Sequence, residues 1–160
     1  MTRFHSLQIA DVRRETADAV SLGLVVPDAL RAEFAFEPGQ YLTLEADIGG
    51  ERVRRSYSIC SGLDDGELRV AIKKVVGGKF STFAAQSLKS GARIDVMPPE
   101  GRFTAPALAG AAPHLVLFAA GSGITPILSI AATTLEEQPE SKFTLVYGNR
   151  RMASVMFNEA

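Results

Sequence analysis

Hydrophobic and polar residues alternate in short runs along the first two thirds of the chain, up to about residue 104. Runs with a period of two cover residues 41–45, 52–59, 68–75 and 92–97, and residues 16–26 form a further candidate strand. Turn-forming pairs such as Pro38-Gly39 and Gly77-Gly78 separate these runs. Short alternating strands divided by turn residues predict a small antiparallel β-barrel or sandwich.

One segment inside this region has a different period. Between residues 80 and 88, the side chains of Phe80, Phe83, Ala84 and Leu88 recur at helical spacing. Residues three and four apart share one face of a helix, so the pattern predicts one short amphipathic helix within the β domain.

The period changes again after residue 113. Residues 105–113 carry no charge, two prolines and a glycine, and we interpret them as a linker between a domain at 1–104 and a second unit at 114–160. Residues 114–120 and 143–147 are apolar runs typical of strands buried on both faces, and residues 127–135 have helical spacing between them. This order predicts one βαβ unit, the beginning of a Rossmann-like domain that we expect to be incomplete.

Composition and charge narrow the possible functions. The 160 residues are 46% apolar and 22% charged with a net charge of −1, which favours a folded core and argues against general electrostatic binding to nucleic acid or acidic membranes. A single cysteine, Cys60, excludes an internal disulfide and a cysteine-ligated metal site within this chain. Residues 103–135 lack charge, but prolines and glycines divide them into pieces too short to span a membrane. With no signal-peptide pattern at the N-terminus, we expect a cytoplasmic protein.

Positive charge is concentrated between residues 52 and 79, where seven basic side chains face three acidic ones. Within the strand predicted there, Arg55 and Tyr57 project from the same face, and Ser58 follows with a hydroxyl and a backbone N–H. A phosphate joined to a flat heterocycle would meet all three groups. A strand with solvated outward arginines is an equally good interpretation of these residues alone.

Two glycine-rich segments precede predicted helices. The segment from Gly77 to Thr82 leads into the helix at 80–88, and Gly121-x-Gly123-x-x-Pro126 lies between a strand and a helix. Free N–H groups at a helix N-terminus attract phosphate, and glycine lets the backbone approach a pyrophosphate closely. The alternatives are a hairpin end with Ser81 as an N-cap, and an ordinary strand-to-helix turn that has proline where the dinucleotide fingerprint has its third glycine.

Together and in this order, these features resemble the ferredoxin–NADP⁺ reductase superfamily over nearly the whole chain. The flavin motif Arg-x-Tyr-Ser matches residues 55–58, Pro-Gly-Gln-aromatic matches 38–41, and the flavin-phosphate segment matches 78–82. The nicotinamide motif Gly-x-Gly-x-x-Pro matches 121–126, and Tyr-Gly-x-Arg matches 147–150. The resemblance implies a Greek-key antiparallel β-barrel that binds flavin, followed by the first part of a nicotinamide-binding α/β domain.

The resemblance also implies roles for individual residues. Arg55 would bind the flavin pyrophosphate, while Tyr57 stacks on the isoalloxazine and Ser58 lies near its N5, which makes Tyr57 and Ser58 the expected catalytic pair. The other expected cofactor-binding residues are Ser56, Ile72, Lys73, Lys74, Gly77, Gly78, Lys79, Phe80, Ser81, Thr82, Gly121, Gly123, Thr125, Pro126 and Arg150. No metal ligand is expected.

Within the superfamily, the chain is most similar to the reductase components of phenylacetyl-CoA epoxidase systems. Three segments carry this similarity: RRSYSIC, IKKVVGGKFSTF and YGNRRMASVMF. Other oxygenase reductases and flavohaemoglobin-type modules are related branches. The resemblance implies electron transfer from NAD(P)H through FAD, rather than FMN, to an iron–sulfur centre that supplies an oxygenase. A [2Fe–2S] domain would lie outside this chain, because one cysteine cannot hold the cluster. Arg150 and Arg151 favour NADPH over NADH, since an acidic residue usually grips the ribose hydroxyl of NADH at that position.

Two alternatives remain open from the sequence. The chain could be a small β-barrel binding module in which Arg54, Arg55, Lys73 and Lys74 grip a nucleic acid or an acidic partner. It could also be an inactive piece of a reductase, since a single βαβ unit is a poor platform for nicotinamide.

Overall fold

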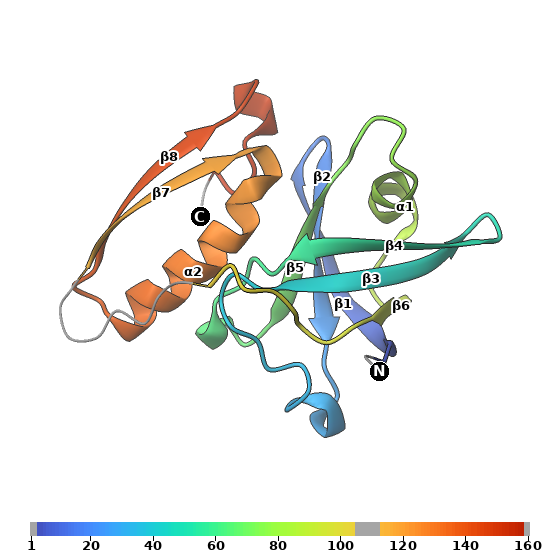
Figure 1. The fold of residues 1–160 in the computed structure, drawn as a ribbon. Helices are drawn as coiled ribbons and strands as arrows, with labels where there is room; N and C mark the ends of the chain where they lie inside the picture. The colour runs from blue at the N-terminus through green and yellow to red at the C-terminus, as the bar shows by residue number, and fades with distance from the viewer. Residues whose placement is uncertain (1–2, 105–112, 159–160) are drawn as a thin grey trace.

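A six-stranded antiparallel sheet forms the first part of the molecule. The computed structural model describes residues 3–104 and 113–158. The strands are β1 (His5–Thr16), β2 (Ala19–Val25), β3 (Tyr41–Ile48), β4 (Glu51–Ser58), β5 (Leu68–Lys73) and β6 (Arg93–Val96). Figure 1 shows them crossing one another on the side of the molecule that carries α1 (Lys79–Ser87).

The sheet closes into a barrel. Its strand order is β4-β3-β6-β1-β2-β5, so β6 lies between two strands that come much earlier in the chain, as in a Greek key. The outer strands β4 and β5 meet where Ile59 bridges Val70 and where the Cys60 N–H donates to the Arg69 carbonyl at 2.9 Å. The predicted antiparallel β-barrel is confirmed.

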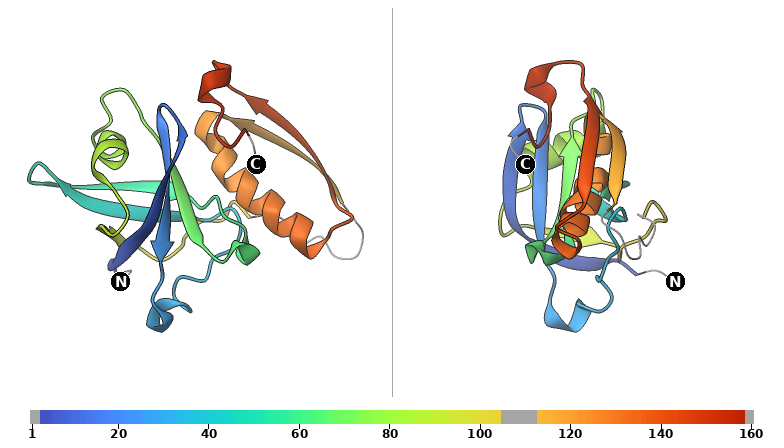
Figure 2. Two further views of the ribbon diagram at one scale, coloured as in Figure 1. Left: turned by 180° about the vertical axis from the view of Figure 1, so that it is seen from behind. Right: turned by 90° about the vertical axis from the view of Figure 1, so that its left-hand side faces the viewer.

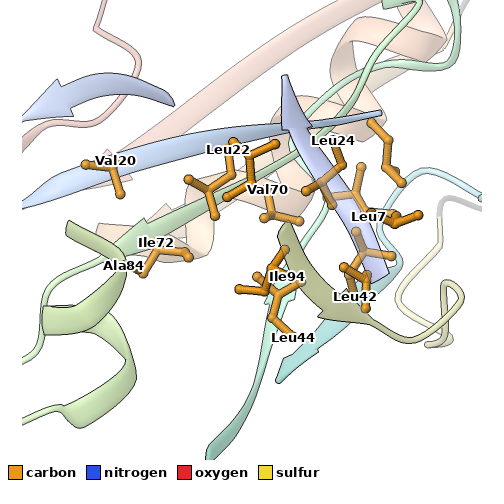
Figure 3. Packing of buried hydrophobic residues seen from close by; sticks show 14 of the residues in the cluster. Leu7, Val20, Leu22, Leu24, Leu42, Leu44, Val70, Ile72, Ala84 and Ile94 are labelled. Carbon is orange, nitrogen blue, oxygen red and sulfur yellow. The ribbon is translucent and has the colours of Figure 1, made fainter. Parts of the chain in front are cut away.

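The barrel interior is filled by aliphatic side chains from every strand. Figure 3 shows Leu22, Val70, Leu44 and Ile94 converging from four different strands, and each is 3% exposed or less. At one end of the barrel, Phe80 and Ala84 of α1 join this core. The helix predicted at 80–88 is therefore confirmed to within one residue at each end.

The second unit consists of β7 (His114–Ala120), α2 (Ile124–Glu137) and β8 (Lys142–Gly148). The two strands pair in parallel from His114 opposite Lys142 to Ala120 opposite Gly148, which confirms the predicted βαβ unit. Figure 1 and the left view of Figure 2 place α2 between the barrel and these strands. Helix α2 begins at Ile124, three residues earlier than predicted, because Pro126 in the first turn needs no N–H partner there.

Four short 3-10 helices complete the described structure. They cover Asp28–Leu30, Leu63–Asp65, Gly121–Gly123 and Met152–Ser154. In the part of the chain that the structure describes, no helix combines the length and hydropathy needed to cross a membrane. Most of the predicted linker, at 105–112, lies outside the described residues, so the domain boundary stays a prediction.

One predicted strand has different bounds, and one expectation about burial was wrong. Residues 16–26 are not one strand: β1 ends at Thr16 and β2 starts at Ala19, and the Thr16 hydroxyl donates to the Asp18 carboxylate at 2.6 Å in the turn between them. Strand β1 was not predicted, although its sequence also alternates between polar and apolar residues.

The wrong expectation was burial of residues 114–120 and 143–147 on both faces. One face of β7 packs towards α2 through Leu117 and Ala119, but the other leaves Val116 54% and Phe118 72% exposed. An apolar run indicates that both faces of a strand can be buried. Whether both faces are buried depends on a second element that packs on the outer face.

Candidate functional site

A cleft of about 560 Å³ lies between the barrel and the N-terminal end of α2. Strand β4, the end of β5, the start of α1 and the turn before α2 all contribute to it. Its lining residues are Arg55, Ser56, Tyr57, Ser58, Ala71, Lys73, Val75, Gly78, Lys79, Phe80, Ser81, Ser122, Gly123, Thr125 and Pro126. The cleft therefore joins the three segments that the sequence singled out separately.

Strand alternation separates the neighbouring arginines of β4. Arg54 points away from the cleft: it bonds to the buried carboxylate of Glu45, and its guanidinium carbon lies 4.8 Å from the centre of the Phe4 ring. Arg55 lines the cleft and remains exposed, with one contact from its Nη1 to the Arg54 carbonyl at 2.6 Å. The cation that the flavin motif requires is thus the one available to a ligand.

Tyr57 provides an aromatic surface in the same cleft. Its ring centre lies 5.7 Å from that of Phe80, which is 1% exposed and belongs to the core. Burial raises the pKa of Tyr57 to about 12, so its hydroxyl is neutral and keeps its proton near neutral pH. A neutral half-buried ring on a fixed support suits stacking against a flat heterocycle.

The turn at Gly78 forms a tight corner of the cleft. A Cβ atom on Gly78 would lie 2.5 Å from the Ser81 hydroxyl oxygen and 3.0 Å from the Val75 carbonyl, so the corner tolerates only glycine. The Ser81 hydroxyl accepts the Val75 N–H at 3.1 Å and is 5% exposed. Ser81 lines the cleft, but its hydroxyl already bonds to the loop at Val75, and the alternative of Ser81 as an N-cap is wrong because Gly78 holds that position.

Lys79 also lines the cleft and is ion-paired with Glu51. Hydrogen bonding to Lys79 holds the pKa of the Glu51 carboxyl below its ordinary value. Both side chains are more than half exposed, so the pair is weak and a phosphate could displace the carboxylate.

The opposite wall of the cleft is the turn Gly121–Gly123 and the first residues of α2. Ser122, Gly123, Thr125 and Pro126 line it, and Gly121 has a φ of +52°, a left-handed conformation that favours glycine. The Thr125 hydroxyl donates to the Ser122 carbonyl at 2.9 Å and so closes the turn on itself.

Six of the predicted site residues do not line the cleft. They are Ile72, Lys74, Gly77, Thr82, Gly121 and Arg150. The Ile72 side chain is 1% exposed within the barrel core, so only its backbone could meet a ligand, and the Lys74 N–H donates to the Asp18 carbonyl at 2.6 Å. Their assignments rest on the motif match and stay predictions.

Three lining residues were not predicted: Ala71, Val75 and Ser122. Ala71 lies one residue before the 72–74 segment, and Val75 one residue after it. Ser122 is the variable position inside the glycine motif, where the sequence gives no signal beyond its place in the turn.

Comparison with known proteins agrees with this geometry. Residues 7–105 match the family model described as "Oxidoreductase FAD-binding domain". The chain belongs to the oxidoreductase FAD-binding domain family. Residues 117–160 match a second model, described as "Oxidoreductase NAD-binding domain". The first match thus covers most of the barrel, and the second covers the βαβ unit from residue 117 onwards.

Two curated relatives extend the match. The chain is 48% identical over all of its length to one subunit of the 1,2-phenylacetyl-CoA epoxidase of Escherichia coli, and it covers 45% of that subunit. It is 40% identical, over 96% of its length, to the ferredoxin reductase component of 3-ketosteroid-9-alpha-monooxygenase from Rhodococcus rhodochrous, of which it covers 43%. The chain therefore spans less than half the length of these relatives.

Among solved structures, a ferredoxin NADP⁺ reductase from Neisseria gonorrhoeae with bound FAD and NADP superposes with a TM-score of 0.82. It is 21% identical, and the match covers 99% of this chain and 63% of that one. The fold of this oxidoreductase FAD-binding domain is thus that of ferredoxin–NADP⁺ reductases, and the resemblance drawn from the motifs is confirmed.

Proposed function

We propose that this chain is the flavin-binding part of an NAD(P)H-dependent reductase, and that its cleft holds FAD against the nicotinamide nucleotide. The observation that carries the proposal is the single cleft that joins Arg55 and Tyr57 of the barrel to Gly123 and Thr125 of the βαβ unit. Two ligands bound to these two walls would meet face to face.

The groups that line the barrel wall fit FAD. An exposed guanidinium at Arg55 and an ammonium at Lys79 match a pyrophosphate, and the half-buried Tyr57 ring matches a flat heterocycle. Gly78 lines the cleft and has no side chain, so the backbone there could approach the phosphates closely. Arg55 and Lys79 would neutralise the phosphates, and Tyr57 would orient the ring.

Ser58 would hold the reacting edge of the ring. It follows Tyr57 on β4 and offers the cleft a hydroxyl and a backbone N–H, which can donate to a ring nitrogen and a ring carbonyl. The chemistry that FAD supplies when bound is acceptance of a hydride from reduced nicotinamide and release of electrons one at a time. The protein then needs no acid–base pair, and its residues serve alignment and exclusion of water.

The relatives indicate where the electrons go. One is named as a subunit of an epoxidase and the other as the ferredoxin reductase component of a monooxygenase. We therefore propose that the full protein supplies an iron–sulfur centre of an oxygenase, with the phenylacetyl-CoA epoxidase system as the better match by identity of the two. NADPH is the proposed electron donor because Arg150 and Arg151 follow β8 and are exposed. A reducing cytoplasm is the proposed location.

The binding-module alternative loses support from the same geometry. Of its four proposed cations, Arg54 is ion-paired with Glu45. Lys73 donates to the Ser154 carbonyl at 3.0 Å. This leaves Arg55 and Lys74, and two cations are a weak basis for binding a polyanion, so we propose no nucleic-acid or membrane partner.

Anaerobic mixing of the FAD-loaded protein with each reduced nucleotide tests the proposal. We expect the visible absorbance of the flavin to disappear, and to do so faster with NADPH than with NADH. The Ser58→Ala variant should slow this reduction about tenfold, because it loses one hydrogen bond at the reacting edge.

Ser87→Ala is the matched control, since Ser87 is exposed at the end of α1 and does not line the cleft. A protein that binds FAD but is reduced by neither nucleotide would contradict the proposed hydride transfer and favour an inactive piece of a reductase. Equal rates with both nucleotides would overturn the preference for NADPH.

A further inference from the structure

The turn Gly121–Gly123 has its carbonyl groups held from two directions. The hydroxyl of Tyr147, on the neighbouring strand β8, donates to the Gly121 carbonyl at 2.8 Å. The hydroxyl of Thr125 donates to the Ser122 carbonyl at 2.9 Å. The Ile124 N–H also points to both of these carbonyl oxygens. Each oxygen therefore has two donors, which matches its two lone pairs.

This arrangement determines which backbone groups the turn can present. The first N–H groups of a helical segment have no partner within that segment, so those of Ser122 and Gly123 are available to a ligand. A carbonyl oxygen that rotated into the cleft would repel a phosphate. With both carbonyls engaged, the turn presents donors to the cleft.

Tyr147 reaches the turn because of the strand register. Parallel pairing places it opposite Ala119, two residues before Gly121. Its ring packs into the apolar cluster beneath α2, and its hydroxyl extends to the Gly121 carbonyl. Gly121 adopts a left-handed φ of +52°, and a glycine backbone changes conformation easily. The hydrogen bond from Tyr147 therefore restrains the orientation of the Gly121 peptide.

We propose that Tyr147 is a positioning residue for nucleotide binding. Its hydroxyl fixes the orientation of the Gly121 peptide, Thr125 fixes that of Ser122, and together they aim the Ser122 and Gly123 N–H groups at the phosphates of the nicotinamide nucleotide. This inference rests on the proposed function, since it takes the turn as the nucleotide-binding wall of the cleft. It adds a residue that does not line the cleft.

Titration of the ¹⁵N-labelled protein with inorganic pyrophosphate and with NADP⁺ tests the proposal, with the amide resonances of Ser122 and Gly123 as the probe. We expect both ligands to shift these two resonances. Tyr147→Phe should raise the dissociation constant for both ligands about 5- to 10-fold, since it removes one hydrogen bond and keeps the ring. Thr125→Val, which keeps the shape of the side chain, should act in the same direction.

Thr144→Val is the matched control. Thr144 lies on the same strand and its hydroxyl contacts the His114 ring at 2.8 Å, away from the turn. It should leave both dissociation constants unchanged. Unfolding midpoints of all variants separate positioning from stability, because a purely structural Tyr147 would lower the midpoint without changing the affinity.

Three outcomes overturn the proposal: unchanged affinity in both Tyr147→Phe and Thr125→Val, an equal change in Thr144→Val, or no shift of the Ser122 and Gly123 amides in the parent protein. Failure of the proposed function gives a different result. A protein that binds pyrophosphate at the turn but does not bind FAD would refute the flavin assignment and leave the role of Tyr147 intact.

Discussion

Glu45 binds Arg54 of β4 on the side of the strand that faces away from the cleft. Its carboxylate is 2% exposed and bonds to both Arg52 and Arg54, whose own side chains are mostly solvated. Burial raises the pKa of Glu45, but the hydrogen bonds from Arg54 and Arg52 outweigh that effect, so the pKa lies below its ordinary value of 4.5. Because successive side chains of a strand point to opposite faces, Arg55 lies on the side of the cleft.

The stability of the barrel should therefore depend on pH through Glu45. A pKa that is lower in the folded state means that the unfolded chain binds the proton more readily, so the contribution of Glu45 is complete above about pH 4.5 and is lost as the pH falls towards the folded pKa. Glu45→Gln should lower the free energy of unfolding by about 1–2 kcal/mol at pH 7 and flatten its acid dependence. Urea unfolding at a series of pH values measures both.

Glu51→Gln is the control at the residue scale. Glu51 also pairs with a barrel cation, Lys79, but both partners are exposed, so its replacement should change stability little. A similar loss in both variants, or an acid profile that Glu45→Gln leaves unchanged, would contradict this account.

At the scale of elements, buried hydroxyl groups join α2 to the barrel. The Ser129 hydroxyl, 0% exposed, donates to the Ser61 carbonyl at 2.6 Å, and the Leu63 N–H donates to the Thr133 hydroxyl at 3.1 Å. Between them, a Cβ atom on Gly62 would lie 3.0 Å from the Ala132 methyl group. These contacts hold α2 against the segment that connects β4 to β5.

Ser129→Ala should loosen this junction. It leaves the buried Ser61 carbonyl without its donor, which should lower the free energy of unfolding by about 1–3 kcal/mol. Chemical denaturation, followed by circular dichroism, measures the change. Thr134→Ala serves as the control because its hydroxyl donates to a carbonyl of the same helix, that of Ile130, at 2.8 Å, and the loss of stability should stay within about 0.5 kcal/mol. Equal losses of unfolding free energy in the two variants would show that the hydrogen bond from Ser129 to the Ser61 carbonyl does not stabilise the junction between α2 and the barrel.

For the whole molecule, local patterns were sufficient to predict an antiparallel barrel or sandwich, the βαβ unit and the three segments that line the cleft, and the resemblance to a known superfamily decided in favour of the barrel. Alternation and helical spacing depend on neighbours in sequence, and so do the turns at Gly78 and Gly121. The outer face of β7 could not be predicted, because exposure of Phe118 depends on what covers the sheet. The engagement of Lys79 by Glu51, 28 residues away in the sequence, also depends on a tertiary contact that no short motif encodes.

Equilibrium titration with FAD tests the central claim most directly, because Arg55, Tyr57 and the Gly78 corner were assigned to one ligand. We expect one FAD to bind per chain, more tightly than FMN. Arg55→Gln should weaken FAD binding about 10- to 100-fold, since it removes a charge-assisted hydrogen bond to the pyrophosphate. Arg31→Gln, which changes an exposed arginine paired with Asp28 outside the cleft, should bind FAD like the parent. A folded protein that does not bind FAD, or one that binds it equally well with and without the Arg55 guanidinium, would contradict the account.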